Sequence, residues 1–231
     1  IDHSGNNSYL REKYSCQIAM PACEAMICSS MINLKLYYNT LSMTEITEHL
    51  GHMVCPVDFP IADEQTSIKM HGIEFKILHT PGHSTAHICL FTPDDVAYIG
   101  DALISHNVMN GAKMPYASIL SEDLKSKEKL YGLKYSKYVI AHKGIYEDIN
   151  ELIRDNINFY QLRAEKICEL IVKPMTLQEL MQKVIASFNI HVVTVYKYNL
   201  IEKMLRSYLE YLDEQQRIKL VMIDGLLKYA K

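Results

Sequence analysis

The chain has 231 residues, of which 48% are hydrophobic and 22% are charged, and its formal net charge is −3. This composition is typical of a soluble globular protein with one large domain, or with one medium and one small domain. The slight negative charge argues against a protein whose whole surface coats nucleic acid or an anionic membrane.

Short elements are predicted in the first part of the chain. In order, these are a helix from Asn7 or Ser8 through Lys13, a buried strand over residues 17–20, a helix from about residue 22, a helix or turn over residues 45–52, and a loop with a short strand over residues 55–64. Pro21 would end the first strand, because proline lacks the N–H that a strand ladder needs.

Strand patterns become clear from residue 67 onward. Residues 67–70 and 73–78 alternate apolar and polar side chains on either side of His71-Gly72. This pattern predicts a β-hairpin. A second pair of strands is expected over residues 87–91 and 96–99, followed by a helix that Ser121 can cap, a strand over residues 138–140 and a long helix over residues 149–170.

The C-terminal part has a different pattern. Lys173-Pro174 interrupts the preceding helix, and Thr176 with Glu179 forms a capping box for a helix to about residue 187. A helix over residues 194–212 and a hairpin around Asp224-Gly225 complete the chain. Because helices followed by a terminal hairpin resemble a winged helix, we predict a second domain over residues 173–231.

A tyrosine-rich tract between Tyr196 and Tyr211 allows two interpretations. It can form a stacking surface for nucleic acid, but its helical spacing favours core packing. Lys203 and Arg206 are accompanied by acidic residues, so no basic stripe results. DNA is therefore disfavoured as a partner, and the second domain is expected to serve as a lid, a substrate contact or a homodimer surface.

Histidine and aspartate residues follow the ends of several predicted strands. The run from His79 to His83 (His-Thr-Pro-Gly-His) follows the first hairpin, Gly100-Asp101 follows residues 96–99, and His142 follows residues 138–140. Imidazole and carboxylate are ligands for zinc-like cations, and strand ends bring distant segments together. A metal site is the natural interpretation. Taken alone, Asp101 can also be a turn aspartate and His142 a surface histidine.

The chain also opens with an Asp-His pair, Asp2-His3, which taken alone suggests an unstructured terminus. Together with the His79 to His83 run, Gly100-Asp101 and His142, this pair resembles the second to fifth motifs of the metallo-β-lactamase-fold hydrolases. The resemblance covers residues 1–172. It implies an α/β fold of the αβ/βα sandwich type with its N-terminal strands missing, followed by the small helical, winged-helix-like domain.

The resemblance also implies a ligand set for two metal ions. One ion would keep His83 and the bridging Asp101, and the other would bind Asp2, His3, Asp101 and His142. His79 would support the turn. Two zinc ions are expected, with iron or manganese as alternatives, because mixed nitrogen and oxygen ligands select poorly among these metals.

In the family, the Asp-His pair ends a longer motif, His-x-His-x-Asp-His, whose first two histidines bind the first metal. This chain begins after them, and Ile1 is not a methionine. We therefore expect the chain to be part of a longer protein. If the two histidines are absent from the gene, a non-catalytic binding or regulatory module becomes the alternative.

The activity implied by the resemblance is hydrolysis by a metal-bound hydroxide, in which Asp2 would also shuttle a proton to the leaving group. No large insertion separates Asp101 from His142, which favours a small ester, thioester or lactone over nucleic acid. An endoribonuclease or phosphodiesterase of the same fold is the alternative, with RNA as its substrate.

Four further residues lie close to the motifs in the sequence. His87 and His106 can orient a ligand or meet substrate, and Lys113 and Tyr116 can form the rim of a pocket. The remaining histidines lack a second ligand at useful spacing and are expected at the surface or in the core.

The cysteines point to a cellular compartment. Six cysteines include no Cys-x-x-Cys pair, and several have apolar neighbours. Reduced, buried thiols in a cytoplasmic protein fit this pattern best. The most apolar early stretch, residues 18–34, is interrupted by Pro21 and Glu24 and so predicts no membrane span.

Overall fold

The computed structural model describes residues 2–231, and Ile1, at which the predicted first domain begins, lies outside them. The helices are α1 (Asn7–Tyr14), α2 (Ala22–Ile27), α3 (Met31–Tyr37), α4 (Met43–Leu50), the short 3-10 helix η1 (Gly51–Met53), α5 (His106–Gly111), α6 (Leu120–Glu128), α7 (Asn150–Leu170), α8 (Leu177–Ser187) and α9 (Val195–Glu214). The strands are β1 (Ala19–Pro21), β2 (Phe59–Ile61), β3 (Ser67–Met70), β4 (Ile73–His79), β5 (Ile88–Phe91), β6 (Val96–Gly100), β7 (Lys137–Ile140), β8 (Gly144–Tyr146), β9 (Lys219–Ile223) and β10 (Leu226–Ala230). The α/β class expected from the sequence is confirmed.

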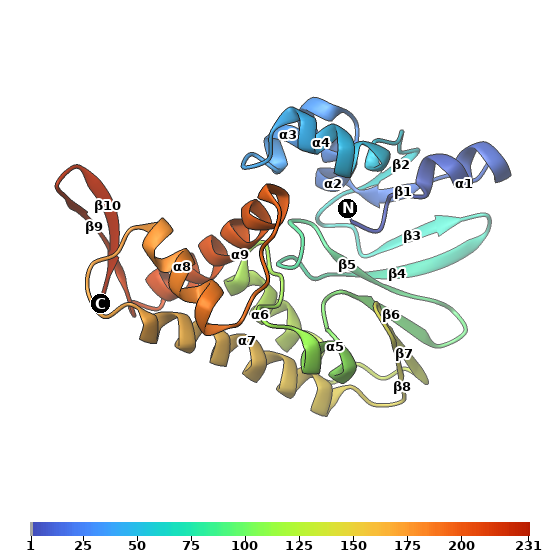
Figure 1. Ribbon diagram of the computed structural model, residues 1–231. Coiled ribbons are helices and arrows are strands. Elements are labelled where there is room, and N and C mark those ends of the chain that lie inside the picture. Colours follow the sequence, from blue (N-terminus) through green and yellow to red (C-terminus); the bar gives the residue numbers. More distant parts are fainter. Residues whose placement is uncertain (1) are drawn as a thin grey trace.

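The main sheet has six strands in the order β3-β4-β5-β6-β7-β8 (Figure 1). All neighbouring pairs are antiparallel except β6 and β7, which are parallel. Strands β4, β6 and β7 therefore run in the same direction, and the residues that follow them lie at one edge of the sheet. The predicted ligands His83, Asp101 and His142 follow these three strands and therefore lie at that edge.

A separate pair of short parallel strands, β1 and β2, lies above this sheet together with α1 to α4 (Figure 1). Ile18, Leu34, Ile46 and Cys55 belong to the buried core of this region. Pro21 pairs with Ile61 at the end of β1, so it is the last residue of the strand and not the first residue beyond it. A strand end tolerates proline because no further ladder donor is needed there.

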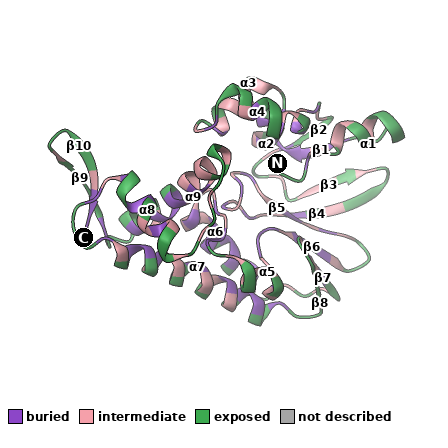
Figure 2. Ribbon diagram, in the orientation of Figure 1, coloured by how far each residue is buried: buried purple, intermediate pink, exposed green. Residues whose placement is uncertain are grey.

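Two further cores lie below and beside the sheet (Figure 2). One joins β5, β6 and β7 to Leu152 and Ile153 of α7. The other joins α6, α7, α8, α9 and Tyr229 of the terminal hairpin, and so takes buried residues from both sides of Lys173-Pro174. The predicted domain boundary at residue 173 stays a prediction. Within residues 2–231, none of the helices combines the length and apolar composition needed to cross a membrane.

Helix caps show where local sequence was sufficient and where it was not. Thr176 and Glu179 form the predicted capping box of α8. The predicted cap Ser121 is wrong, because α6 begins at Leu120. The Leu120 N–H instead donates to Ser207 Oγ of α9 at 2.9 Å, so a residue 87 positions away satisfies this helix end. At α1, the N-cap is Asn6 without a side-chain hydrogen bond, so the caps expected at Asn7 or Ser8 are also wrong.

Lys203 of α9 joins the C-terminal region to α3. Its Nζ lies 3.8 Å from the ring centroid of Tyr37 and 4.5 Å from that of Tyr38. This nitrogen is buried and has no hydrogen-bond partner among the described residues. Burial lowers the pKa of Lys203 to about 8, and the two ring faces offset part of that cost through cation–π attraction.

We expect Lys203→Met to be more stable than the wild type below pH 8, by up to about 2 kcal/mol, because a buried unpaired cation is removed. Between pH 8 and 10.5 the unfolded lysine binds more protons than the folded one, so wild-type stability rises by up to about 3 kcal/mol relative to the variant. The stabilities of the wild type and Lys203→Met should therefore converge as the pH rises. Thermal unfolding of both proteins at pH 7 and pH 9.5 measures this effect. Exposed Lys197→Met serves as control, and a stability difference between the wild type and Lys203→Met that stays constant with pH contradicts the prediction.

Candidate metal centre

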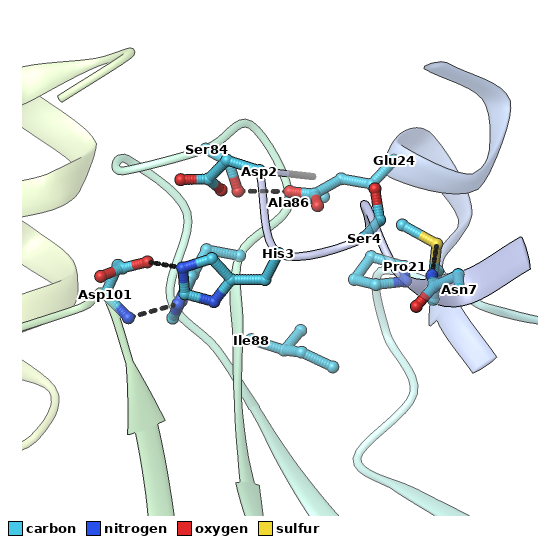
Figure 3. A pocket seen from close by; sticks show the side chains of 12 residues that line it. Asp2, His3, Ser4, Asn7, Pro21, Glu24, Ser84, Ala86, Ile88 and Asp101 are labelled. Carbon is cyan, nitrogen blue, oxygen red and sulfur yellow. Dashed lines mark hydrogen bonds and ion pairs between the residues drawn. The ribbon is translucent and has the colours of Figure 1, made fainter. Parts of the chain in front are cut away.

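Four segments bring the predicted ligands to the shared sheet edge. Asp101 follows β6 and is only 5% exposed in its side chain. Three imidazole Nε2 atoms surround its carboxylate: His3 at 3.0 Å, His142 at 3.4 Å and His83 at 3.7 Å. Figure 3 shows His3 pointing at Asp101 from the segment before α1. The buried carboxylate is thus the centre of the cluster.

The cluster divides into two groups of three residues that share Asp101. His3, Asp101 and His142 form one group, and Asp2, His83 and Asp101 form the other, with the ligand atoms of each within 4.8 Å of one another. Asp2 Oδ2 lies 3.5 Å from His83 Nε2. The structure therefore groups Asp2 with His83, whereas the resemblance implied a set that joins Asp2 to His3 and His142.

These side chains fit divalent cations. Two ligand atoms that each lie about 2.1 Å from an ion with tetrahedral coordination are about 3.4 Å apart. The distances from the imidazole nitrogens to the Asp101 carboxylate are close to this value. His3 Nε2 and His142 Nε2 are also 3.3 Å apart, so two nitrogens converge on one point. Each group offers three protein donors, as catalytic zinc sites do, and leaves a position for water or substrate. The nitrogen and oxygen set also suits iron or manganese.

The charges within the cluster stabilise one another. Burial raises the pKa of Asp101, but the hydrogen bond from His3 and the charges of His83 and His3 lower it by more. The pKa of Asp101 is therefore below its usual range. The hydrogen bond to Asp101 raises the pKa of His3 against the opposing effect of burial. For Asp2, burial raises the pKa, but the hydrogen bond and charge of His83, together with the charge of His3 and other nearby charge, lower it by more. The two carboxylates are thus ionised, as metal ligands must be.

The turn that carries His83 is held against α6. Gly82 adopts φ 136°, and its carbonyl accepts the N–H groups of Ser118 and Ile119 at 2.8 and 3.0 Å. Ser126 Oγ of α6 donates to the Pro81 carbonyl at 2.7 Å. A side chain at Gly82 would collide with the backbone of Asp123. The Pro-Gly sequence therefore allows the turn to approach a helix closely.

His87 supports the backbone of Asp101. Its Nε2 accepts the Asp101 N–H at 3.1 Å, so Nδ1 carries the proton and donates to Thr80 Oγ1 at 2.8 Å. Burial lowers the pKa of His87 to about 4, which keeps the ring neutral. A Cβ at Gly100 would lie 2.7 Å from His87 Nε2, so this glycine makes room for the contact. In the sequence, the only feature that points to this role of His87 is its position close to the ligand motifs.

The other residues near the motifs have separate positions. His79 Nε2 contacts the Gln65 carbonyl at 2.8 Å, outside the ligand cluster. His106 pairs with Asp155 at 3.0 Å. Tyr116 places its ring 5.2 Å from that of His83, whereas Lys113 is exposed and offers its carbonyl to Arg163. Among these residues, Tyr116 is the one for which a ring contact with a predicted ligand is seen in the described part of the chain.

The turn that carries His142 contains backbone strain. His142 and Lys143 have φ values of 56° and 79°, in the left-handed region that glycine favours. Glycine at either position would avoid that cost. Here Ser105 Oγ donates to the His142 carbonyl at 3.3 Å and helps to hold the turn.

We expect Lys143→Gly to stabilise the protein by about 0.5 kcal/mol, because relief of left-handed strain exceeds the backbone entropy that glycine costs. Lys143 is exposed, so the substitution removes little packing. Chemical denaturation measures the change. The control is Lys137→Gly in β7, which should destabilise, and equal destabilisation by both substitutions contradicts the prediction.

Two cavities open beside the cluster, each of about 220 Å³. Polar side chains, including those of Asp2, His3, Glu24 and Asp101, line the first cavity (Figure 3). The second also reaches Asp2 and His83, but most of its wall consists of tyrosine, leucine and methionine side chains. No local sequence pattern reveals this apolar cavity, because its walls come from five separated parts of the chain.

Comparison with known proteins shows the family of this chain. The sequence profile of the Metallo-beta-lactamase superfamily matches residues 1–142. The Beta-lactamase-like protein 2 homolog of Drosophila melanogaster is 27% identical over 131 residues, which are 52% of this chain and 41% of that protein. The chain spans less than half the length of the curated relatives it matches.

Solved structures share the fold. A metallo-beta-lactamase family protein of Thermus thermophilus superposes with a TM-score of 0.65 at 20% identity, covering 94% of this chain and 72% of that one. A beta-lactamase domain protein of Burkholderia ambifaria gives a TM-score of 0.68 at 16% identity, covering 98% and 70%. The fold is therefore that of the metallo-β-lactamase proteins. The chain belongs to the Metallo-beta-lactamase superfamily, which binds divalent metals and includes hydrolases.

Proposed function

We propose that this protein is a metal-dependent hydrolase that cleaves a small ester, thioester or lactone. Membership of the superfamily supports hydrolysis as the reaction class. The convergence of three imidazoles on the buried Asp101 carboxylate supports metal dependence. Zinc is the expected metal, with iron or manganese as alternatives.

Bound cations at this centre would polarise the substrate carbonyl and make water nucleophilic at neutral pH. The clustered side chains of this chain would hold and orient them. Asp101 is buried between the two groups of ligands, and His87 fixes its backbone. Asp2 is 48% exposed in its side chain and faces both cavities, so its carboxylate can carry a proton to the leaving group.

The observation that favours a small neutral substrate over RNA is the charge of the cavity walls. Among the described residues, neither cavity is lined by a lysine or an arginine, and the first is lined by three acidic residues. Recognition of a polyanion relies on basic side chains along its backbone. On α9, Arg206 is paired with Glu202 at 2.8 Å, which further reduces any basic surface.

The test removes metal with a chelator and then restores zinc, manganese or ferrous iron separately. We expect loss of hydrolysis of phenyl esters, thioesters and lactones on removal, and recovery with at least one metal. An RNA oligonucleotide is the comparison substrate. Cleavage of RNA without ester hydrolysis would overturn the substrate assignment, and no hydrolysis with any metal would favour the non-catalytic binding module.

A further inference from the structure

We propose that the apolar cavity beside His83 binds an aromatic acyl group of the substrate, and that α9 forms one wall of this acyl site. The inference rests on the proposed hydrolase function and specifies its substrate. It also assigns a role to the C-terminal region, which would contribute side chains directly to substrate recognition.

The position of the cavity is the first argument. Asp2, His83 and Ser84, which belong to or adjoin the ligand cluster, line the cavity together with Leu200 and Met204 of α9. A substrate whose acyl group enters this space would present its carbonyl carbon toward Asp2 and His83. The cavity is therefore continuous with the place where bond cleavage would occur.

Size is the second argument. The cavity has a volume of about 220 Å³. An apolar protein cavity of about 150 Å³ holds benzene, so this space accepts a benzene ring with one or two additional carbon atoms. A phenylacetyl group fits that description. An acetyl group would leave most of the cavity unfilled, and a bare cavity wall loses its dispersion contacts.

The chemistry of the wall is the third argument. Four tyrosines line the cavity: Tyr37, Tyr38, Tyr116 and Tyr196. Tyr37 and Tyr38 contact each other edge to face, with centroids 4.8 Å apart and an angle of 90° between the ring planes. Aromatic rings prefer such edge-to-face or offset contacts, and methionine sulfur packs well against ring edges. This wall therefore favours an aromatic group over an aliphatic chain of equal volume.

The wall is also held in place before substrate arrives. Tyr37 donates from its hydroxyl to Ser118 Oγ at 3.4 Å, and Lys203 of α9 lies against the faces of Tyr37 and Tyr38. Burial raises the pKa of Tyr38, so its side chain stays a neutral phenol. Side chains that are already held in place lose less entropy when an apolar group binds.

The test compares acetyl, hexanoyl and phenylacetyl esters that share one leaving group. We expect kcat/KM for the phenylacetyl ester to exceed that for the acetyl ester at least about tenfold. Leu200→Trp fills the cavity and should remove this preference, so that kcat/KM for the phenylacetyl ester falls to or below that for the acetyl ester. Val195→Trp, on the same helix but 70% exposed and outside the cavity, is the matched control and should keep the preference.

A binding measurement separates this inference from the proposed function. Phenylacetamide resists hydrolysis, and its saturation-transfer NMR signal reports contact with the protein. We expect the signal with the wild type and Val195→Trp, and its loss with Leu200→Trp. An equal signal with both variants, or equal kcat/KM for all acyl groups in an active enzyme, would overturn the acyl site. Binding without any ester hydrolysis would retain the site and overturn the hydrolase proposal.

Discussion

Substitution Asp101→Asn should lower both metal content and ester hydrolysis by at least about 100-fold, more than the loss of an outer partner of a metal ligand usually costs. Asp101 is the one residue shared by both ligand groups, and its side chain is 5% exposed. An amide keeps the shape but loses the charge that His3 and His83 stabilise. The NH₂ group of the asparagine, which carries partial positive charge, would also repel a cation.

Elemental analysis of metal per chain, together with ester hydrolysis at saturating metal, measures this effect. The control is Asp94→Asn, because Asp94 is exposed in the turn that precedes β6, at the end of the strand away from the ligands. It should keep wild-type metal content and activity. Normal metal content in Asp101→Asn with lost hydrolysis would show that Asp101 acts in the reaction without being needed as a ligand.

Substitution Gly82→Ala should destabilise the protein by about 3 kcal/mol, because the new Cβ overlaps neighbouring backbone. That atom would lie 2.1 Å from Asp123 Cα and 2.2 Å from Asp123 N, and φ is 136° at this position. Asp123 cannot withdraw easily, since its buried carboxylate is paired with the buried Lys127 on the same helix. The turn carrying His83 would have to move instead.

Thermal unfolding should show a decrease in Tm of about 10 °C for Gly82→Ala. Loss of hydrolysis of more than about tenfold should accompany it, because His83 would leave the ligand cluster. Gly111→Ala is the control: no atom lies within 4 Å of the Cβ position there, so stability should change little. A Tm for Gly82→Ala equal to that of the control would contradict the close packing of turn and helix.

Much of the fold could be predicted because the deciding interactions are local. The hairpin of β3 and β4 follows from period-two alternation around His71-Gly72, and both turn residues adopt positive φ. The capping box at Thr176 needs only residues three positions apart. The predicted strand ends also explain why His83, Asp101 and His142 meet, since β4, β6 and β7 run in the same direction.

Other features depend on contacts between distant residues, which no local pattern encodes. Short elements such as α3, α5 and β8 were missed, because packing and not propensity stabilises so few residues. The tyrosine tract of α9 was interpreted as core, and Tyr208 is indeed buried, but Tyr196 faces the apolar cavity. The helical period is the same in both cases, and only the neighbouring segments decide which face meets core and which meets cavity.

The sequence by itself thus determined the order of the predicted ligand residues, the strands that carry them and the superfamily, because these depend on residue type and short spacing. Tertiary structure alone decided that Asp2 lies beside His83, that Ser207 caps α6, and that α3 and α9 share one apolar cavity. The physical reason is that such contacts form only when the packing of whole elements brings distant side chains within a few ångströms.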